Sequence, residues 1–238
     1  QSPPSHPYDY LANYIHENKW ANKNIGVEMD SYYYTAENHE RLLKQCPNAK
    51  FINGHLLVNW VRYIKSEAEI AYMKQGAKLV QAGMQTAYNE IKPGVKQSFV
   101  AGKIQETLLG GNEETQTGGE YAGLNMILAS GKSASASHLT PTDKKFLENE
   151  GTIIELGGVK NRYHCALSRT VYIGKPDSKI DDTLKITNEG VEKAIESTKP
   201  GNTCHDVAVA FWSVLEKYGL EKESRCGYSI GLGYPPDW

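Results

Sequence analysis

Apolar and polar positions along the first sixty residues follow two different periods. Apolar residues recur at helical spacing over residues 10–17 and 36–45, and short apolar runs occupy residues 24–29 and 49–52. The first pattern is typical of amphipathic helices and the second of strands. Short strands that alternate with helices favour a layered sheet. The N-terminal end of the chain is therefore predicted to be a small α/β piece.

A longer amphipathic pattern over residues 66–91 predicts a single helix, which Pro93-Gly94 ends. Its first turn carries carboxylates, and these favour the positive end of the helix dipole. Because this helix follows a charged connector, we expect a domain boundary near its start. The predicted domains cover residues 1–62 and 63–238.

The chain contains an internal repeat. Lys92-Pro93-Gly94 recurs 107 positions later as Lys199-Pro200-Gly201. The same offset relates further pairs of identical residues, namely Gly83/Gly190, Ala87/Ala194, Val100/Val207, Ala101/Ala208 and Leu108/Leu215. Each copy is predicted to form a helix, a Pro-Gly turn and a second helix.

Strand signals fill the segment between the two copies, at residues 124–128, 152–156 and 168–173. Together with the repeat they predict an α+β domain with pseudo-two-fold duplicated halves. Such halves leave a cleft between them that suits a small-molecule pocket. Little chain follows the second helix pair, and the sequence starts without Met, so we expect a piece of a longer protein that is inactive alone.

Composition narrows the possible partners. Of 238 residues, 26 are Lys or Arg and 28 are Asp or Glu, so the formal net charge is −2. This balance argues against nucleic-acid binding, and the sequence lacks an apolar run long enough to span a membrane. The four cysteines are widely spaced, which suits reduced thiols in the cytoplasm better than disulfides or a zinc site.

Two residues stand out as candidates for chemistry. Glu155 lies within an Ile-Ile-Glu-Leu-Gly-Gly strand, where its carboxylate is either partly buried or on the solvent face. His138 lies in a Ser-Ala-Ser-His-Leu-Thr loop before a strand, a position that fits a surface histidine as well as an acid or base. Glu120, in a Gly-Gly-Glu-Tyr turn, is expected to be solvated.

These segments together resemble the superfamily of creatinases, prolidases and methionine aminopeptidases. The resemblance rests on the Pro-Gly repeat, the Ser-His loop, the hairpin of residues 151–170 and the Gly-Tyr-Ser-Ile-Gly segment at 227–231. It implies the pita-bread fold over residues 62–238, preceded by the C-terminal part of a smaller α/β N-terminal domain. It also implies a homodimer for the full-length protein.

The resemblance also shows where the sequence departs from the metallopeptidases of this superfamily. Three of their metal-ligand positions fall on Glu155, Ala166 and Tyr228. Ala166 has no donor atom, and a neutral tyrosine replaces an imidazole poorly. We therefore expect no metal and no other cofactor.

Among the metal-free branches, the chain most resembles the ectoine hydrolases, which open the cyclic amidine of ectoine to N-acetyl-diaminobutyrate. The resemblance implies a small zwitterionic substrate. Glu155 would act as general base or nucleophile, and His138 would protonate the departing nitrogen. The residues proposed to bind the substrate are Tyr163, His164, Arg169 and Tyr228.

Other interpretations stay open at this stage. Tyr163 also suits packing in a strand, and Arg169 also suits a structural ion pair. The chain as a whole also fits a metal-dependent Xaa-Pro dipeptidase, a creatinase-like amidinohydrolase, or an inactive pita-bread domain used for binding.

Overall fold

The computed structural model describes residues 6–121, 123, 126–136 and 138–233. The chain divides into two compact units between Ile64 and Lys65. This division lies close to the boundary predicted near residue 62. The assignment of each unit to a domain of the superfamily stays a prediction.

The first unit is the predicted α/β piece. Helices α1 (Pro7–Glu17) and α2 (Ala36–Gln45) pack together, and strands β1 (Asn24–Val27) and β2 (Lys50–Asn53) pair in parallel. A short helix α3 (Leu57–Arg62), which the sequence pattern did not predict, follows β2. Small and aliphatic side chains make the core, namely Ala12, Ile15, Leu42, Cys46 and Ala49.

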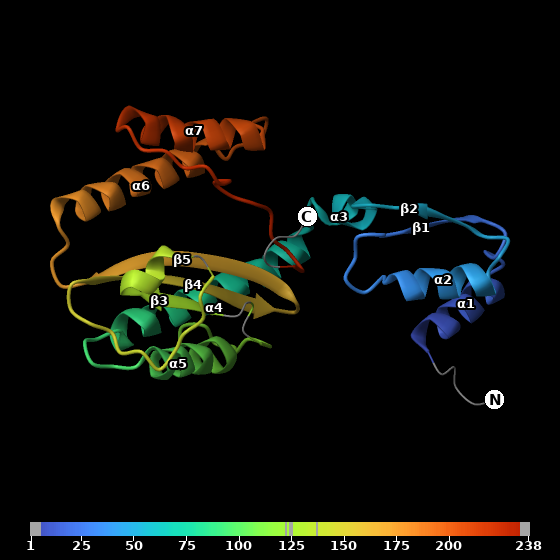
Figure 1. The fold of residues 1–238 in the computed structure, drawn as a ribbon, viewed down its shortest axis with the longest axis horizontal. Coiled ribbons are helices and arrows are strands. Elements are labelled where there is room, and N and C mark those ends of the chain that lie inside the picture. Colours follow the sequence, from blue (N-terminus) through green and yellow to red (C-terminus); the bar gives the residue numbers. More distant parts are fainter. Residues whose placement is uncertain (1–5, 122, 124–125, 137, 234–238) are drawn as a thin grey trace. The chain divides into compact units, whose positions relative to one another are not determined.

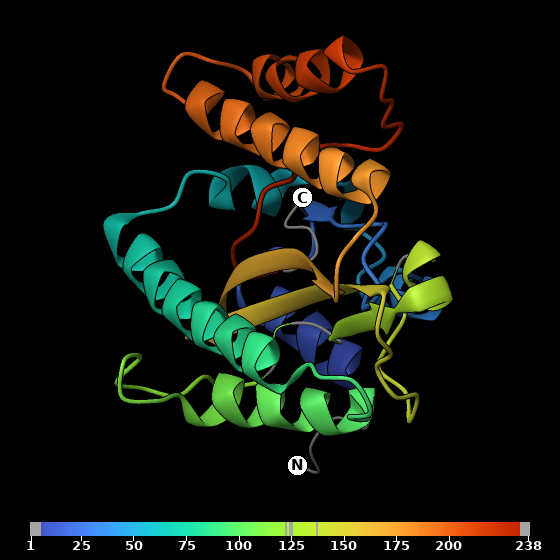
Figure 2. The same cartoon turned by 90° about the vertical axis from the view of Figure 1, so that its left-hand side faces the viewer.

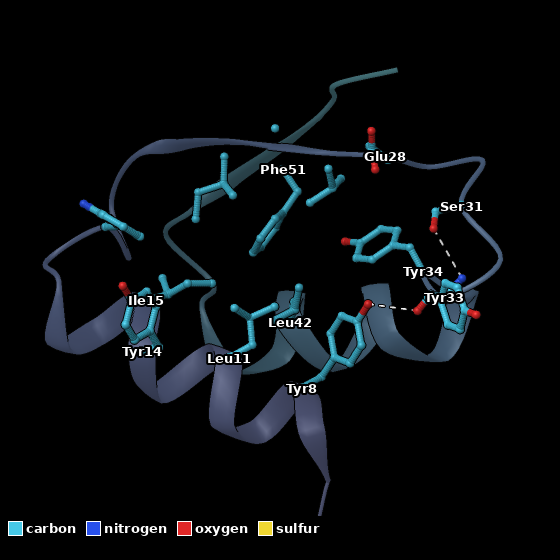
Figure 3. Close-up of a pocket in the computed structure, with 14 residues that line it drawn as sticks. Tyr8, Leu11, Tyr14, Ile15, Glu28, Ser31, Tyr33, Tyr34, Leu42 and Phe51 are labelled. Carbon is cyan, nitrogen blue, oxygen red and sulfur yellow. Dashed lines mark hydrogen bonds between the residues drawn. The ribbon is translucent and has the colours of Figure 1, made fainter. Parts of the chain in front are cut away.

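A pocket of about 350 Å³ opens in this first unit (Figure 3). Its lining combines aromatic and aliphatic side chains, and at one side of it the Tyr8 hydroxyl donates a hydrogen bond to the Tyr33 carbonyl at 3.0 Å. None of the residues that the sequence proposed for chemistry lines this pocket. The catalytic proposal therefore rests on the second unit.

In the second unit, two helices cover one face of an antiparallel sheet (Figure 1). The helices are α4 (Glu67–Glu90) and α5 (Gln97–Gly110). The strands run in the order β3 (Ile127–Ser130), β4 (Glu150–Lys160) and β5 (Tyr163–Ile173), and the 3-10 helix η1 (Gly131–Ser135) follows β3. Between helices and sheet lies an aliphatic core that includes Leu128, Ile154 and Leu156.

Helix α4 begins where the sequence predicts. The Ser66 side chain accepts from the Glu69 N–H, and the Glu69 carboxylate accepts from the Ser66 N–H, so both partners of a capping box are present. Farther along, α4 crosses β4 with Gly76 against Gly158. A Cβ atom on Gly158 would lie 2.2 Å from the Gly76 carbonyl oxygen, so only glycine allows this approach.

The repeat appears as a second helix pair, α6 (Ser178–Ser197) and α7 (Cys204–Lys217). The repeated glycines allow the paired helices to approach closely in both copies. A Cβ atom on Gly83 would lie too close to Leu108 of α5, and one on Gly190 would lie too close to Phe211 of α7. In both views this second pair lies on the side of the sheet away from α4 and α5 (Figures 1 and 2).

Several element bounds differ from those predicted. Strands β4 and β5 are longer than the apolar runs that indicated them, because cross-strand hydrogen bonds continue through polar residues to the turn. Strand β3 begins at Ile127, later than expected, and residues 124 and 125 of the predicted strand and residue 137 of the Ser-His loop lie outside the described residues. No helix in the described ranges is long and apolar enough to cross a membrane.

Candidate active site

Residues of β4 alternate between two environments. Ile154 and Leu156 face the helices and belong to the core, so Glu155 between them points to the opposite face of the sheet. Glu155 is partly buried, which decides between the two placements left open by the sequence. Its paired neighbours are Ile127 on β3 and Ser168 on β5.

The strand register places further residues on the face of Glu155. Gly157 pairs with Ala166, and beyond them Val159 pairs with His164. Directly paired residues share a face, and successive positions on one face are about 7 Å apart. The face that carries Glu155 therefore continues over a floor of two small residues to His164.

His164 lies at the end of this face, with only 4% of its surface exposed. Its backbone N–H donates to the Gly231 carbonyl at 2.8 Å, and its ring Nδ1 lies 3.2 Å from the same oxygen. Because a carbonyl only accepts hydrogen bonds, this contact requires a proton on Nδ1. The C-terminal segment is thereby fastened to the outer edge of β5.

His138 lies beside the opposite edge of the sheet. It follows η1 in a left-handed backbone conformation, with φ 63°, and is exposed. The carbonyl of the next residue, Leu139, accepts from the Leu128 N–H at 3.3 Å. Leu128 is adjacent to Ile127, the partner of Glu155, so the structure brings the His138 loop alongside the strand next to Glu155.

Tyr163 and Arg169 lie on the other face of the hairpin. Tyr163 donates a hydrogen bond to Glu69 Oε1 at 2.7 Å and stacks on Tyr72, both on α4. Arg169 pairs with Ile154, which faces the helices, and its Nη1 donates to the Ser168 carbonyl at 2.7 Å. The structure does not bring these two predicted substrate-binding residues to the face of Glu155.

Tyr228 is 39% exposed and lies on the same segment as Gly231. The Arg225 guanidinium carbon lies 5.5 Å from the centre of its ring, within the range of a cation–π contact. Tyr228 therefore lies three residues before the glycine whose carbonyl contacts His164, and its part in the site stays a prediction.

The donors on this face do not fit a two-metal centre. Ala166 offers no ligand atom beside Glu155, and two metal ions need several convergent oxygen and nitrogen donors. Across the described ranges, no group of three or more His, Cys, Asp or Glu side chains is placed to hold a metal ion.

The sequence patterns missed the part played by Glu120 and its neighbours. Glu120 is exposed, as predicted, and its carboxylate also accepts from the backbone N–H groups of Asn161 and Arg162 at 2.8 and 3.2 Å. The only signal was the short polar stretch between two strand patterns. That stretch indicates a hairpin turn but not what binds it.

The fold and site define an α+β domain built on duplicated helix pairs, and comparisons with known proteins give its family. Residues 71–237 match metallopeptidase family M24. An Xaa-Pro dipeptidase from Bacillus anthracis superposes with a TM-score of 0.83 over 95% of this chain and 61% of its own, at 21% identity. At that identity the likeness shows the fold alone. The chain belongs to family M24, and the predicted pita-bread fold is confirmed.

Curated relatives match along the entire chain. An ectoine hydrolase from Halomonas elongata is 42% identical over 100% of this chain and 61% of its own length. An uncharacterized hydrolase/peptidase of Sinorhizobium fredii is 39% identical over 100% of this chain and 60% of its own. The chain thus spans about 60% of the length of these relatives. The resemblance predicted from the motifs is confirmed.

Proposed function

We propose that the full-length protein containing this chain hydrolyses the cyclic amidine of ectoine without a metal ion. The observation that carries the proposal is the placement of Glu155 on the sheet face opposite α4 and α5, next to Ala166, which has no donor atom. The 42% identity to an ectoine hydrolase supports the substrate.

The geometry of this face suits a small cationic ring. Ectoine carries a delocalised amidinium and a carboxylate, so a negative group near its ring nitrogens stabilises it. Glu155 supplies that charge. The next pair along this face, Gly157 and Ala166, has no functional group to compete with Glu155 for the ring nitrogens.

Hydrolysis then needs one water molecule and one proton transfer to nitrogen. Attack at the amidine carbon forms a tetrahedral centre, whose collapse breaks one carbon–nitrogen bond and leaves an acetamide and an amine. We assign to His138 the proton that the departing nitrogen takes up, because the loop that carries it runs beside β3, the neighbour of Glu155.

Glu155 has two possible parts in this reaction. As a general base, it takes a proton from the attacking water. As a nucleophile, it bonds to the amidine carbon, and water later releases the product. Both routes consume one water and give the same product. Mass spectrometry during turnover separates them, since only the second route adds the mass of the substrate to the protein. Digestion should then locate the added mass on the peptide that contains Glu155.

His164 and Tyr228 complete the proposed site as residues that border the substrate. Tyr163 and Arg169 are left out, because their hydrogen bonds lie with α4 and with the Ser168 carbonyl. The packing interpretation of Tyr163 therefore has the stronger support.

The test replaces the two reacting groups in the full-length protein. Glu155→Gln and His138→Ala should each lower kcat for ectoine by about 100-fold or more, the range for a lost acid, base or nucleophile. Exposed Glu148→Gln and His205→Ala serve as matched controls and should keep kcat near wild type. Activity near wild type in either site variant would remove that residue from the proposed reaction.

A substrate panel tests the choice of ectoine. An archaeal Xaa-Pro dipeptidase from Pyrococcus horikoshii is 27% identical over 88% of this chain, so Xaa-Pro dipeptides belong in the panel with creatine. Turnover of ectoine alone supports the proposal. Turnover of dipeptides alone would favour the peptidase interpretation, and no turnover of any substrate would favour a binding domain.

A further inference from the structure

The turn that joins β4 to β5 is held in an unusual way. It has two residues, Asn161 and Arg162, with φ 47° and 69°. Both left-handed positions suit a two-residue hairpin loop, for which Asn-Gly is the favoured sequence. Arginine in the second position is strained, because its Cβ crowds the backbone there. Such strain persists where the surrounding contacts maintain it.

Two side chains, Glu120 and Lys160, fasten this turn to the segment of residues 117–121. The Glu120 carboxylate accepts from both backbone N–H groups of the turn, and its Oε2 lies 3.9 Å from Arg162 Nε. Lys160 Nζ donates to Thr117 Oγ1 at 2.7 Å and to the Gly118 carbonyl at 3.1 Å. Hydrogen bonds to ionised groups are stronger than neutral ones, so the turn and the segment are held together.

From this turn, ring contacts lead to the proposed site. The Arg162 guanidinium carbon lies 5.5 Å from the centre of the Tyr121 ring. Tyr121 in turn meets the ring of His164 at 5.8 Å and 63°, an edge-to-face arrangement. His164 is buried and shares the face of Glu155. The guanidinium, the phenol and the imidazole thus form a continuous chain of contacts.

We infer that Glu120 and Arg162 are positioning residues, which hold the Tyr121 ring against His164 at the end of the face that carries Glu155, where Gly231 binds His164 from the other segment. The inference deepens the proposed function and rests on it for the consequence in catalysis. The strained arginine is explained because glycine, although better suited to the turn, would remove the group that packs on Tyr121.

Turn stability and ring position should therefore respond differently to Arg162→Gly. Glycine relieves the left-handed strain, so the thermal midpoint should stay the same or rise. Tyr121 loses its cation at the same time, so the Tyr121 ring should shift relative to His164, whose own ring stays hydrogen-bonded to Gly231. If Arg162 only stabilised the turn, its replacement would change the thermal midpoint without moving the ring.

The experiment follows the ring protons of His164 by NMR in histidine-labelled protein. Tyr121→Leu gives the reference for complete loss of the tyrosine ring-current shift. Glu120→Ala and Arg162→Gly should each move the His164 signals toward that reference, and Glu120→Gln, which keeps one acceptor oxygen, should move them less. Glu148→Ala, an exposed glutamate outside this network, is the control and should leave them unchanged.

His164 signals that stay at their wild-type positions in both Glu120→Ala and Arg162→Gly would overturn the inference. If Glu120→Ala fails to fold, Arg162→Gly alone still decides, because it is expected to be stable. The measurement needs no substrate, so its outcome is independent of whether ectoine is turned over.

The kinetic arm tests the link to catalysis. In full-length protein, Arg162→Gly should lower kcat for ectoine about tenfold, with a smaller change in KM, because a misplaced group at the site affects the transition state most. Moved His164 signals with unchanged kcat would overturn the catalytic consequence. Absence of ectoine turnover in the wild type would count against the proposed function instead.

Discussion

Glu69 shows how one side chain can serve a helix end and a sheet at once. Its Oε2 accepts from the Ser66 N–H at 2.6 Å and from the Ser66 hydroxyl at 2.7 Å, and its Oε1 accepts from Tyr163. These bonds, those from Ser66 foremost, lower the pKa of Glu69 from 4.5 to about 2. Tyr163 is thus tied to the start of α4, away from Glu155.

This tie gives a prediction for Tyr163→Phe. The variant loses the hydrogen bond to Glu69 but keeps the ring that stacks on Tyr72, so the urea midpoint at neutral pH should fall. The kcat for ectoine in full-length protein should stay within about twofold of wild type. A large loss of kcat with unchanged stability would return Tyr163 to the substrate site.

The same variant should show a characteristic pH dependence. Because the folded-state pKa of Glu69 is depressed, ionised Glu69 stabilises the fold fully above about pH 4.5, and this contribution disappears as the pH falls through about 2. The stability difference between wild type and Tyr163→Phe should therefore narrow over that window. A difference that stays constant with pH would show that Glu69 ionisation plays no part in it.

At the scale of elements, the duplicated helix pairs are the best-predicted feature. The repeat at one offset predicted two matching helix pairs, and in the structure Gly83 and Gly190 lie at corresponding close contacts within the two pairs. The local sequence is sufficient to predict each helix pair, because the two helices that contact each other are consecutive in the chain.

The faces of the hairpin were harder to predict. Which residue of β5 faces Glu155 depends on the register, and the register depends on which two residues form the turn. No apolar pattern marks Asn161 and Arg162 as those two residues. Arg169 was therefore proposed for the substrate although its pairing with Ile154 places it on the helix face. The partners of Glu120 were not predicted, because they are backbone N–H groups of a turn distant in the sequence.

The contact between α4 and β4 makes a prediction about packing. Gly158→Ala would bring a methyl group 2.2 Å from the Gly76 carbonyl oxygen, so it should destabilise the second unit by about 3 kcal/mol through overpacking. Gly151→Ala, on the same strand, is the matched control, because its nearest atom would lie at an ordinary 3.7 Å. Urea unfolding measures both. Equal stability of the two variants would contradict the close approach of α4.

For the whole molecule, motif order was enough to predict the family and its fold, since the metallopeptidase M24 match and the superposition with a dipeptidase agree with it. These comparisons do not establish the activity of the full-length protein, because the chain covers about 60% of the length of its curated relatives. The homodimer and the complete site of the full-length protein therefore stay predictions.

The central claim is hydrolysis of ectoine without a metal ion, and turnover after chelation tests it most directly. Full-length protein is treated with excess chelator, its metal content is checked, and its kcat for ectoine is compared with that of the untreated protein. Because Ala166 leaves the active face without a second carboxylate, the account predicts an unchanged kcat in metal-free protein. Loss of turnover on chelation, with recovery on adding Mn²⁺, Co²⁺ or Zn²⁺, would contradict it.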